Sequence, residues 1–330
     1  MGAMDVVRLC ADRTAVLFLG VGAGAAIGYA FAGDISQVVN REPAAAPQTV
    51  AVSSPTSGKS SIVPPALAKP AKEAEAIECA MPFQPRLLDT VATGGKVRIG
   101  VFGDSYGDGL WAALYHQLPS REHYEVLKFS QQSTGFTRYA SLNLEEHVAE
   151  QLSGQTIDIA VISFGANDTQ GVMHNGKYAA LLSPAWKEEI GARIDRYIGL
   201  LRQHGAIVYW VGLPIMRKAS LDADISGMNA FFAERMQKLD VPFVDTRPMS
   251  VDANGAYAAY LPDTTTHVPK LMRANDGIHM SMGGYQRLTF GLSKRIRRYI
   301  GAAHVRAEIE GKTKPATAES PKPLTEASAG

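Results

Sequence analysis

Residues 97–110 read VRIGVFGDSYGDGL and contain the strongest indication of the fold. Apart from Arg98 and Gly100, the first six side chains of this stretch are large and apolar, which predicts a strand. A glycine-rich turn follows and leads into residues 111–118, whose spacing predicts a helix. Ser105 therefore lies at a strand-to-helix junction.

The same alternation continues toward the C-terminus. Short apolar runs predict further strands at 124–129, 157–163, 206–211 and 242–244. Apolar residues at three- and four-residue spacing predict further helices at 142–151, 186–204, 225–239 and 285–300. Strand–helix alternation indicates parallel strands covered by helices on both faces. We therefore expect an α/β fold, a three-layer α/β/α sandwich with a mainly parallel five-stranded sheet.

Composition describes an ordinary globular protein. Hydrophobic residues make up 46% of the chain and charged residues 20%. The net charge of +1 gives no reason to expect a nucleic-acid partner. Cys10 and Cys79 both lie outside the strand–helix region, so neither a disulfide framework nor a zinc site is indicated.

The first 33 residues have the pattern of an export signal. Arg8 and Arg13 precede an uncharged stretch at 14–32, which ends in a small-x-small sequence, Ala-Phe-Ala, as signal peptidase requires. The stretch also has the roughly 20 residues that span a bilayer. Residues 1–33 are therefore expected to be a signal peptide or an N-terminal membrane anchor, and the rest of the chain to be exported, either periplasmic or secreted.

Low-complexity segments flank the expected domain. Residues 34–80 are rich in Ala, Pro and Ser and cannot bury enough apolar surface to offset their ordering entropy, so we predict a disordered tether. Residues 303–330 alternate Lys, Glu, Pro, Ala and Ser and predict a disordered tail. The folded domain is accordingly expected to span residues 81–302.

Residues suited to acyl chemistry follow three of the predicted strands. In parallel sheets, ligands bind beyond the carboxyl ends of the strands. Ser105 lies at a helix N-terminus, where unpaired N–H groups favour negative charge. Gly135 can bring its N–H close to a ligand, and Asn167 offers a side-chain donor for an oxyanion. A helix cap and two ordinary turns would explain the same residues.

A base and its partner occur together in DGIH at residues 276–279. A serine hydroxyl needs a base to take its proton, and a neutral imidazole is the usual one. Asp276 can accept the other imidazole N–H of His279 and hold the ring in the required tautomer. Half of a metal site would look similar, but no convincing set of further ligands accompanies it.

In combination these blocks resemble the SGNH (GDSL-type) hydrolase superfamily, whose four blocks contribute Ser, Gly, Asn and His. The blocks are GDS at 103–105 with Gly109 four residues after the serine, Gly135, GAND at 165–168 and DGIH at 276–279. The likeness covers roughly residues 95–302 and is greatest to an uncharacterised exported bacterial branch.

The resemblance implies the SGNH/flavodoxin-like form of the fold and a triad of Ser105, His279 and Asp276. It also implies an oxyanion hole formed by the N–H groups of Ser105 and Gly135 and the side chain of Asn167. No metal or organic cofactor is expected. The implied activity is that of an exported serine esterase, with membrane contact only through the N-terminal segment.

Compartment and family together favour a short acyl group, acetyl, on a cell-envelope or extracellular glycan. A lipase or thioesterase and an acyltransferase remain alternatives on the same site. A non-catalytic module that binds a glycan or another envelope partner is a third.

Two further segments could shape a substrate site. Arg217 and Lys218 follow the fourth strand, where they could attract an anionic sugar or could simply be solvated. The stretch from Tyr257 to Arg273 precedes the DGIH block, and its aromatic residues, Tyr260 among them, would suit stacking on a sugar. Loops of this length near a site are often functional, although an ordinary surface insertion would look the same.

Overall fold

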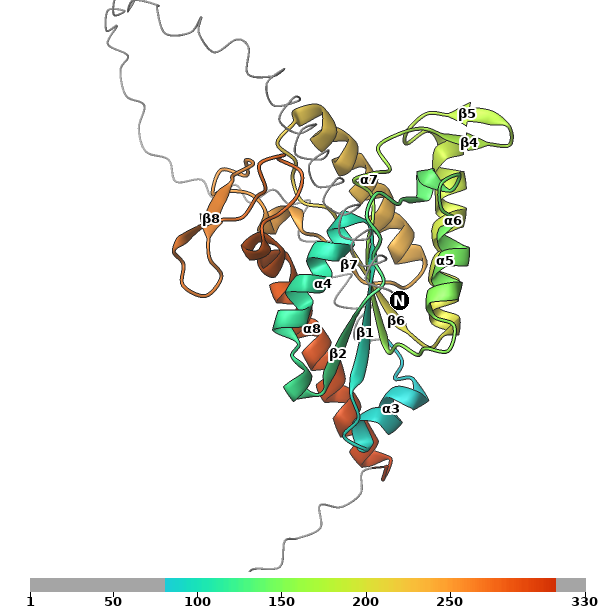
Figure 1. Ribbon diagram of the computed structural model, residues 1–330, viewed down its shortest axis with the longest axis vertical. Coiled ribbons are helices and arrows are strands. Elements are labelled where there is room, and N and C mark those ends of the chain that lie inside the picture. The colour runs from blue at the N-terminus through green and yellow to red at the C-terminus, as the bar shows by residue number, and fades with distance from the viewer. Residues whose placement is uncertain (1–80, 313–330) are drawn as a thin grey trace, which may run out of the picture. The chain divides into compact units, whose positions relative to one another are not determined.

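A five-stranded parallel sheet forms the centre of the domain in the computed structural model, which describes residues 81–312 (Figure 1). The strands are β1 (Val97–Gly103), β2 (Tyr124–Lys128), β3 (Ile159–Ser163), β6 (Ile207–Val211) and β7 (Phe243–Val244). They lie in the order β2-β1-β3-β6-β7, and each neighbouring pair is parallel. The predicted export segment at 1–33, the predicted tether at 34–80 and residues 313–330 of the predicted tail lie outside the described residues.

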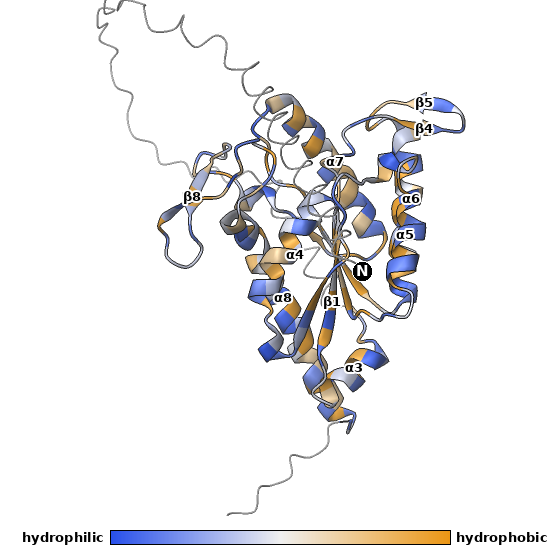
Figure 2. Cartoon of the chain, in the orientation of Figure 1, coloured by the Kyte–Doolittle hydropathy of each residue, from blue (hydrophilic) through white to orange (hydrophobic). Residues whose placement is uncertain are grey.

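Helices cover both faces of the sheet and produce three layers (Figure 1). One face packs against α3 (Pro85–Ala92), α4 (Ser105–Gln117) and α8 (Met282–Ile309). The other packs against α5 (Leu144–Gln151), α6 (Pro184–Gln203) and α7 (Ala219–Lys238). In Figure 2 hydrophobic residues run along the strands, as burial on both faces requires. The predicted α/β/α sandwich is confirmed.

The strand order determines where a ligand would bind. β1 lies between β2 and β3. The chain therefore moves from β1 to one side, to β2, and then crosses back past β1 to β3 on the other side. In open α/β sheets the crevice at such a switch point, beyond the carboxyl ends of the strands, is the usual ligand site. Ser105 follows β1 and Asn167 follows β3, so both lie at this crevice.

All five predicted strands are present with ends within two residues of the prediction, but two helices begin six residues earlier than predicted. α4 begins at Ser105 rather than at 111, and α7 begins at Ala219 rather than at 225. The glycines of α4 concealed its first turns, since glycine lowers helix propensity. Close packing explains one of them, because a Cβ at Gly107 would lie 2.8 Å from Ser130 Cβ and 2.9 Å from Phe102 O.

The predicted C-terminal boundary at 302 was wrong. α8 continues to Ile309, and Ala303 and Ala307 are buried in the same core as Leu87 of α3. Alanine gives a weak hydrophobic signal, so the continuing helical periodicity was hidden in a Lys- and Glu-rich sequence. No helix within residues 81–312 is both long and apolar enough to cross a membrane.

The sequence analysis did not predict α3 or two hairpins, β4 (Val172–His174)–β5 (Lys177–Ala179) and β8 (Tyr260–Pro262)–β9 (Pro269–Leu271). Strands of three residues are too short for periodicity to identify. The second hairpin lies within the long stretch between Tyr257 and Arg273, so part of that stretch is regular structure.

Replacing Gly109 by alanine should destabilise the domain. A Cβ at Gly109 would lie 2.1–2.3 Å from ring atoms of Tyr285, which packs α8 against α4. We expect Gly109→Ala to lower the free energy of unfolding by about 1–3 kcal/mol, as overpacking does. Urea denaturation measures this change. The control is Gly199→Ala in α6, where nothing lies within 4 Å and the helix should gain up to about 1 kcal/mol; equal effects of the two substitutions would contradict the prediction.

Candidate active site

Ser105 is the first residue of α4, in the sharp turn after β1. Asp104 caps the helix, since its Oδ1 accepts a hydrogen bond of 2.9 Å from the N–H of Tyr106. Gly103 has φ +143°, and a Cβ there would lie 2.1 Å from Ser163 O, so the turn requires glycine. Ser105 is half-buried. Its hydroxyl is thus presented beside the unpaired N–H groups of a helix N-terminus.

The structure brings the three predicted triad residues together. Ser105 Oγ lies 2.7 Å from His279 Nε2, although 174 positions separate the two residues in sequence. His279 Nδ1 lies 2.6 Å from Asp276 Oδ2. This arrangement fits a neutral imidazole that donates to Asp276 and accepts the serine proton. The side chains of His279 and Asp276 are 36% and 44% exposed, so this side of the triad is open to solvent.

Asp276 is oriented by its own loop. Its Oδ1 accepts hydrogen bonds from the N–H groups of Ile278 at 2.8 Å and of His279 at 2.9 Å. Partial burial opposes ionisation, but the hydrogen bonds from the imidazole and from these two N–H groups lower the pKa of Asp276 to about 2. Asp276 is therefore a carboxylate at any pH at which a histidine acts as a base.

The residues predicted for the oxyanion hole lie at the same edge of the sheet. Within residues 81–312, neither the N–H of Ser105 nor that of Gly135 donates a hydrogen bond. Gly135 is buried, and a Cβ there would lie 2.4 Å from Asp168 Oδ1. That carboxylate accepts two hydrogen bonds of 2.8 Å from Thr137, which holds the Gly135 loop in place.

Asn167 is already engaged with protein acceptors. Its Nδ2 lies 3.0 Å from Thr134 O and 3.2 Å from Asp104 Oδ2. A side-chain amide has two hydrogens, so both are used in this state. An oxyanion at this position would have to take over one of them.

Asp104 has an unusual environment for a carboxyl group. It is fully buried, and burial raises its pKa to about 7, against the opposing effect of the Tyr106 N–H and with a further contribution from the charge of Asp168. Because this pKa is raised on folding, the contribution of Asp104 to stability is complete below about pH 4 and is lost as the pH rises through 7. The turn that carries the nucleophile therefore includes a group that disfavours folding at alkaline pH.

Two residues that the sequence analysis did not identify as site residues bind the loop of residues 274–281, which carries Asp276 and His279 and is called the catalytic loop below. The ring of Tyr106 stacks against the imidazole of His279 with centroids 5.6 Å apart, and its hydroxyl donates to Ile278 O. The Tyr106 contacts depend on how the loop before α8 packs on α4, so no local motif signals them.

Arg273 is buried and donates through Nη2 to Gly277 O at 3.3 Å and Ile278 O at 3.0 Å. The Arg273 contacts join residues only four and five positions apart, but they depend on the turn that the bridge between Arg273 and Met280 closes.

Arg217 contacts the same loop from outside. Its Nη2 donates to Asn275 O at 2.8 Å, and its backbone N–H donates to Gly277 O at 3.0 Å. A Cβ at Gly277, whose φ is +73°, would lie 2.5 Å from Arg217 Nε. Arg217 is therefore part of the support of the catalytic loop, while Lys218 beside it is exposed and begins α7 as its N-cap.

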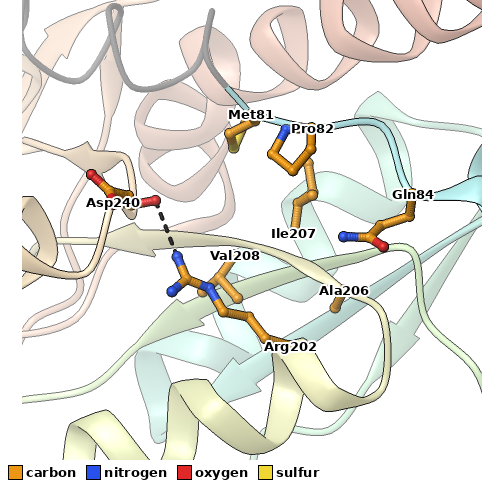
Figure 3. A pocket seen from close by; sticks show the side chains of 8 residues that line it. All are labelled: Met81, Pro82, Gln84, Arg202, Ala206, Ile207, Val208 and Asp240. Carbon is orange, nitrogen blue, oxygen red and sulfur yellow. Dashed lines mark hydrogen bonds between the residues drawn. The ribbon is translucent and has the colours of Figure 1, made fainter.

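A cavity of about 480 Å³ lies at the opposite edge of the sheet (Figure 3). Its lining includes Met81, Gln84 and residues 206–208, where β6 begins, whereas Ser105 follows the end of β1. Because the strands are parallel, this cavity is remote from the triad and is not the candidate active site. Within the described residues, no three His, Cys, Asp or Glu side chains are grouped as a metal ion would require.

The sequence matches the model of a protein family of unknown function, DUF459, over residues 98–295. This is about three fifths of the chain and includes every residue of the triad and of the predicted oxyanion hole. The chain belongs to the DUF459 family. No curated protein matches the chain.

Among solved structures, the DUF459 protein is similar to a GDSL-like lipase from Bacteroides thetaiotaomicron, with 18% identity, a TM-score of 0.42, and coverage of 70% of this chain and 97% of that one. It is similar to a carbohydrate esterase family 3 protein from Talaromyces cellulolyticus, with 14% identity, a TM-score of 0.43, and coverage of 62% and 99%. It is also similar to a catalytic mutant of an acetylxylan esterase from Geobacillus stearothermophilus, with 15% identity, a TM-score of 0.43, and coverage of 63% and 95%.

Replacing Asp276 by asparagine should remove nearly all hydrolytic activity of the triad. The N–H groups of Ile278 and His279 would hold the amide oxygen, so the NH₂ group would face Nδ1 and leave the imidazole in the wrong tautomer. We therefore expect kcat to fall by about 10⁴-fold. Rates of p-nitrophenyl acetate hydrolysis measure this loss. In the wild type, activity changes above about pH 4 should not reflect Asp276, whose pKa is about 2.

Asp263→Asn provides the matched control for this substitution. Backbone N–H groups of Thr265 and Thr266 also hold the pKa of Asp263 at about 2, but this carboxylate lies on the β8–β9 hairpin, outside the triad. Its replacement should leave kcat unchanged. A similar kcat in both variants would contradict the role assigned to Asp276.

Proposed function

We propose that the DUF459 protein is a serine esterase. The observation that carries the proposal is the hydrogen-bonded series of Ser105 Oγ, His279 and Asp276, with successive contacts of 2.7 and 2.6 Å. A hydroxyl, an imidazole and a carboxylate in this order are the groups that acyl transfer through a serine requires. These groups lie at a helix N-terminus and at the switch point of the sheet, where ligands of open α/β sheets usually bind.

In the proposed mechanism, Ser105 Oγ attacks the ester carbonyl while His279 Nε2 takes its proton. The carbonyl oxygen becomes an oxyanion, the leaving alcohol receives the proton from His279, and an acyl-enzyme remains on Ser105. Water, activated by the same imidazole, then releases the acid and restores the serine. If a sugar hydroxyl enters in place of water, the site acts as an acyltransferase.

The oxyanion would be stabilised by groups that are already oriented. The N–H groups of Ser105 and Gly135 donate to no other described residue, so they are free to meet developing charge. Asn167 would join them by exchanging its hydrogen bond to Thr134 or Asp104 for one to the oxyanion. Because the exchange takes place only when negative charge develops, this donor would favour the transition state over the bound ester.

We propose an acetyl or other short acyl group on a cell-envelope or extracellular glycan as the substrate. Two observations support this choice. The exposed side chains of His279 and Asp276 leave the triad accessible to an ester that is attached to a polymer. The export pattern of residues 1–33 would bring the domain to the compartment in which such polymers occur.

Ser105→Ala in the full-length chain tests the proposed function. We expect hydrolysis of p-nitrophenyl acetate to fall by at least about 10³-fold, because the nucleophile is lost while the fold is kept. The control is Ser226→Ala, an exposed serine on α7, which should behave like the wild type. Comparable activity of Ser105→Ala and the wild type on this ester, with both proteins folded, would overturn the proposal.

A second candidate, hydrolysis of esters with longer acyl chains, is favoured by the β8–β9 hairpin. In this antiparallel pair Tyr260 lies opposite Leu271, and Pro262 lies opposite Pro269. All four residues are exposed, Tyr260 by 64% and Leu271 by 41%, whereas Leu261 between them is buried. One face of the hairpin is therefore apolar and open to solvent, which is typical of a binding surface.

This apolar face is joined to the catalytic loop. A separate antiparallel bridge joins Arg273, two residues after β9 ends, to Met280, the residue after His279. Ser281 Oγ also donates to Leu271 O at 2.6 Å, and the next residue, Met282, is 43% exposed. An aliphatic chain attached to an acyl group on Ser105 could lie along this surface.

The double substitution Tyr260→Ser and Leu271→Ser separates the two candidates. If the hairpin binds an acyl chain, KM for p-nitrophenyl octanoate should rise by about 10-fold or more, since two large apolar contacts are lost, while hydrolysis of the acetate should not change. Both side chains are exposed, so the fold should be kept. An unchanged ratio of octanoate to acetate activity would contradict the longer-chain candidate and leave the short-acyl proposal in place.

A further inference from the structure

Arg273 is a buried cation that no described carboxylate contacts directly. Partial burial raises the pKa of Asp222, but Arg247, which is paired with Asp222, and from a distance the charge of Arg273 lower that pKa below its usual value. The side chain of Arg273 is 1% exposed, and no carboxylate of residues 81–312 forms a salt bridge with it. Its Nε and Nη1 have no hydrogen-bond partner among the described residues. The guanidinium lies over the ring of Tyr257, 4.9 Å from its centroid, and 3.9 Å from the sulfur of Met216. Burying an unpaired charge in this way opposes folding.

The hydrogen bonds of Arg273 do not explain why the charge is buried. Its Nη2 donates to the carbonyls of Gly277 and Ile278. Gly277 O also accepts from the backbone N–H of Arg217 at 3.0 Å, and Ile278 O also accepts from the hydroxyl of Tyr106. Both carbonyls would thus keep a donor if Arg273 were replaced by an apolar residue of similar size. The need to satisfy buried polar groups does not account for an arginine here.

We propose that Arg273 is a positioning residue for the reaction, which rests on the proposed function. The two carbonyls that it binds belong to the residues between Asp276 and His279. Both carbonyls accept from the same nitrogen, Nη2, of a rigid, planar guanidinium. This holds the peptide groups of Gly277 and Ile278 turned inward, so that the side chains of Asp276 and His279 are directed toward Ser105. Arg273 thereby holds the imidazole at 2.7 Å from the serine oxygen on a loop whose outer surface is exposed.

Arg273→Met in the full-length chain tests the proposal, because methionine keeps the bulk of the side chain and removes the charge and the donors. A small misplacement of a catalytic group lowers the rate by about 10²-fold, so we expect kcat for p-nitrophenyl acetate to fall by about this factor. KM should change by less than about twofold, since the ester itself does not touch Arg273. The midpoint of thermal unfolding should stay the same or rise, because an unpaired buried charge is gone.

Arg235→Met is the matched control. Arg235 lies on α7 and is paired with Asp195, whose Oδ1 is 2.6 Å from Arg235 Nε. Its loss leaves a carboxylate unpaired, so the midpoint of unfolding should fall while kcat stays the same. The two substitutions remove the same groups and should have opposite effects on stability and activity.

Arg273→Lys and a spectroscopic measurement complete the test. Lysine keeps a donor for the two carbonyls, so its kcat should lie between those of the wild type and Arg273→Met. The proton between His279 Nδ1 and Asp276 should give a downfield NMR signal in the wild type that weakens or broadens in Arg273→Met. A wild-type kcat for Arg273→Met would overturn the proposal. So would a fall in activity that merely follows a lower midpoint of unfolding in both Arg273 variants.

Ser105→Ala, assayed beside these variants, distinguishes the two proposals. If this variant keeps wild-type activity, the proposed esterase function fails. If it is inactive while Arg273→Met is fully active, only the positioning role of Arg273 fails.

Discussion

The packing of α4 against α8 sets the distance between the nucleophile and its base. Ser105 begins α4, and His279 lies three residues before α8 begins at Met282, so the two catalytic side chains are fixed to the N-terminal ends of two adjacent helices. The contact is close because Gly109 has no side chain and the ring of Tyr285 fills the space. Any change that separates these helices would lengthen the 2.7 Å contact between Ser105 and His279 before it affected the sheet.

The catalytic loop is held by groups from several parts of the domain. Tyr106 comes from α4, Arg217 from the segment before α7, and Arg273 from the strand-like residues before the loop itself. Two of these three side chains are buried, while His279 and Asp276 between them are well exposed. Rigid support beneath an exposed pair suits catalysis on bulky substrates, since the reacting groups stay accessible without becoming mobile.

Groups that oppose folding are concentrated at this edge of the sheet. Burial raises the pKa of Asp104 to about 7 and also raises that of Asp168. Arg273, which donates to the carbonyls of Gly277 and Ile278, adds a buried cation. A core built for stability alone would place apolar residues at such positions. Their presence around Ser105, Gly135 and Asn167 is typical of a site at which stability has been given up for activity.

The strands and the local geometry of the site were predictable from the amino-acid sequence alone. Apolar runs located all five strands of the sheet, because burial on both faces leaves a continuous pattern. Ser105 was predictable at the junction after β1. The relation of Asp276 to His279 was also predictable, since residues three apart in a tight turn contact each other without help from the rest of the fold.

The features that the sequence did not predict depend on contacts between segments that lie far apart along the chain. The first turn of α4 was hidden because Gly107 and Gly109 are required by neighbours that lie far away in sequence. The buried charge of Arg273, the engaged amide of Asn167 and the apolar face of the β8–β9 hairpin have no local pattern either. Periodicity records which side of an element is buried, whereas partners, distances and unpaired charges are set by how the elements pack.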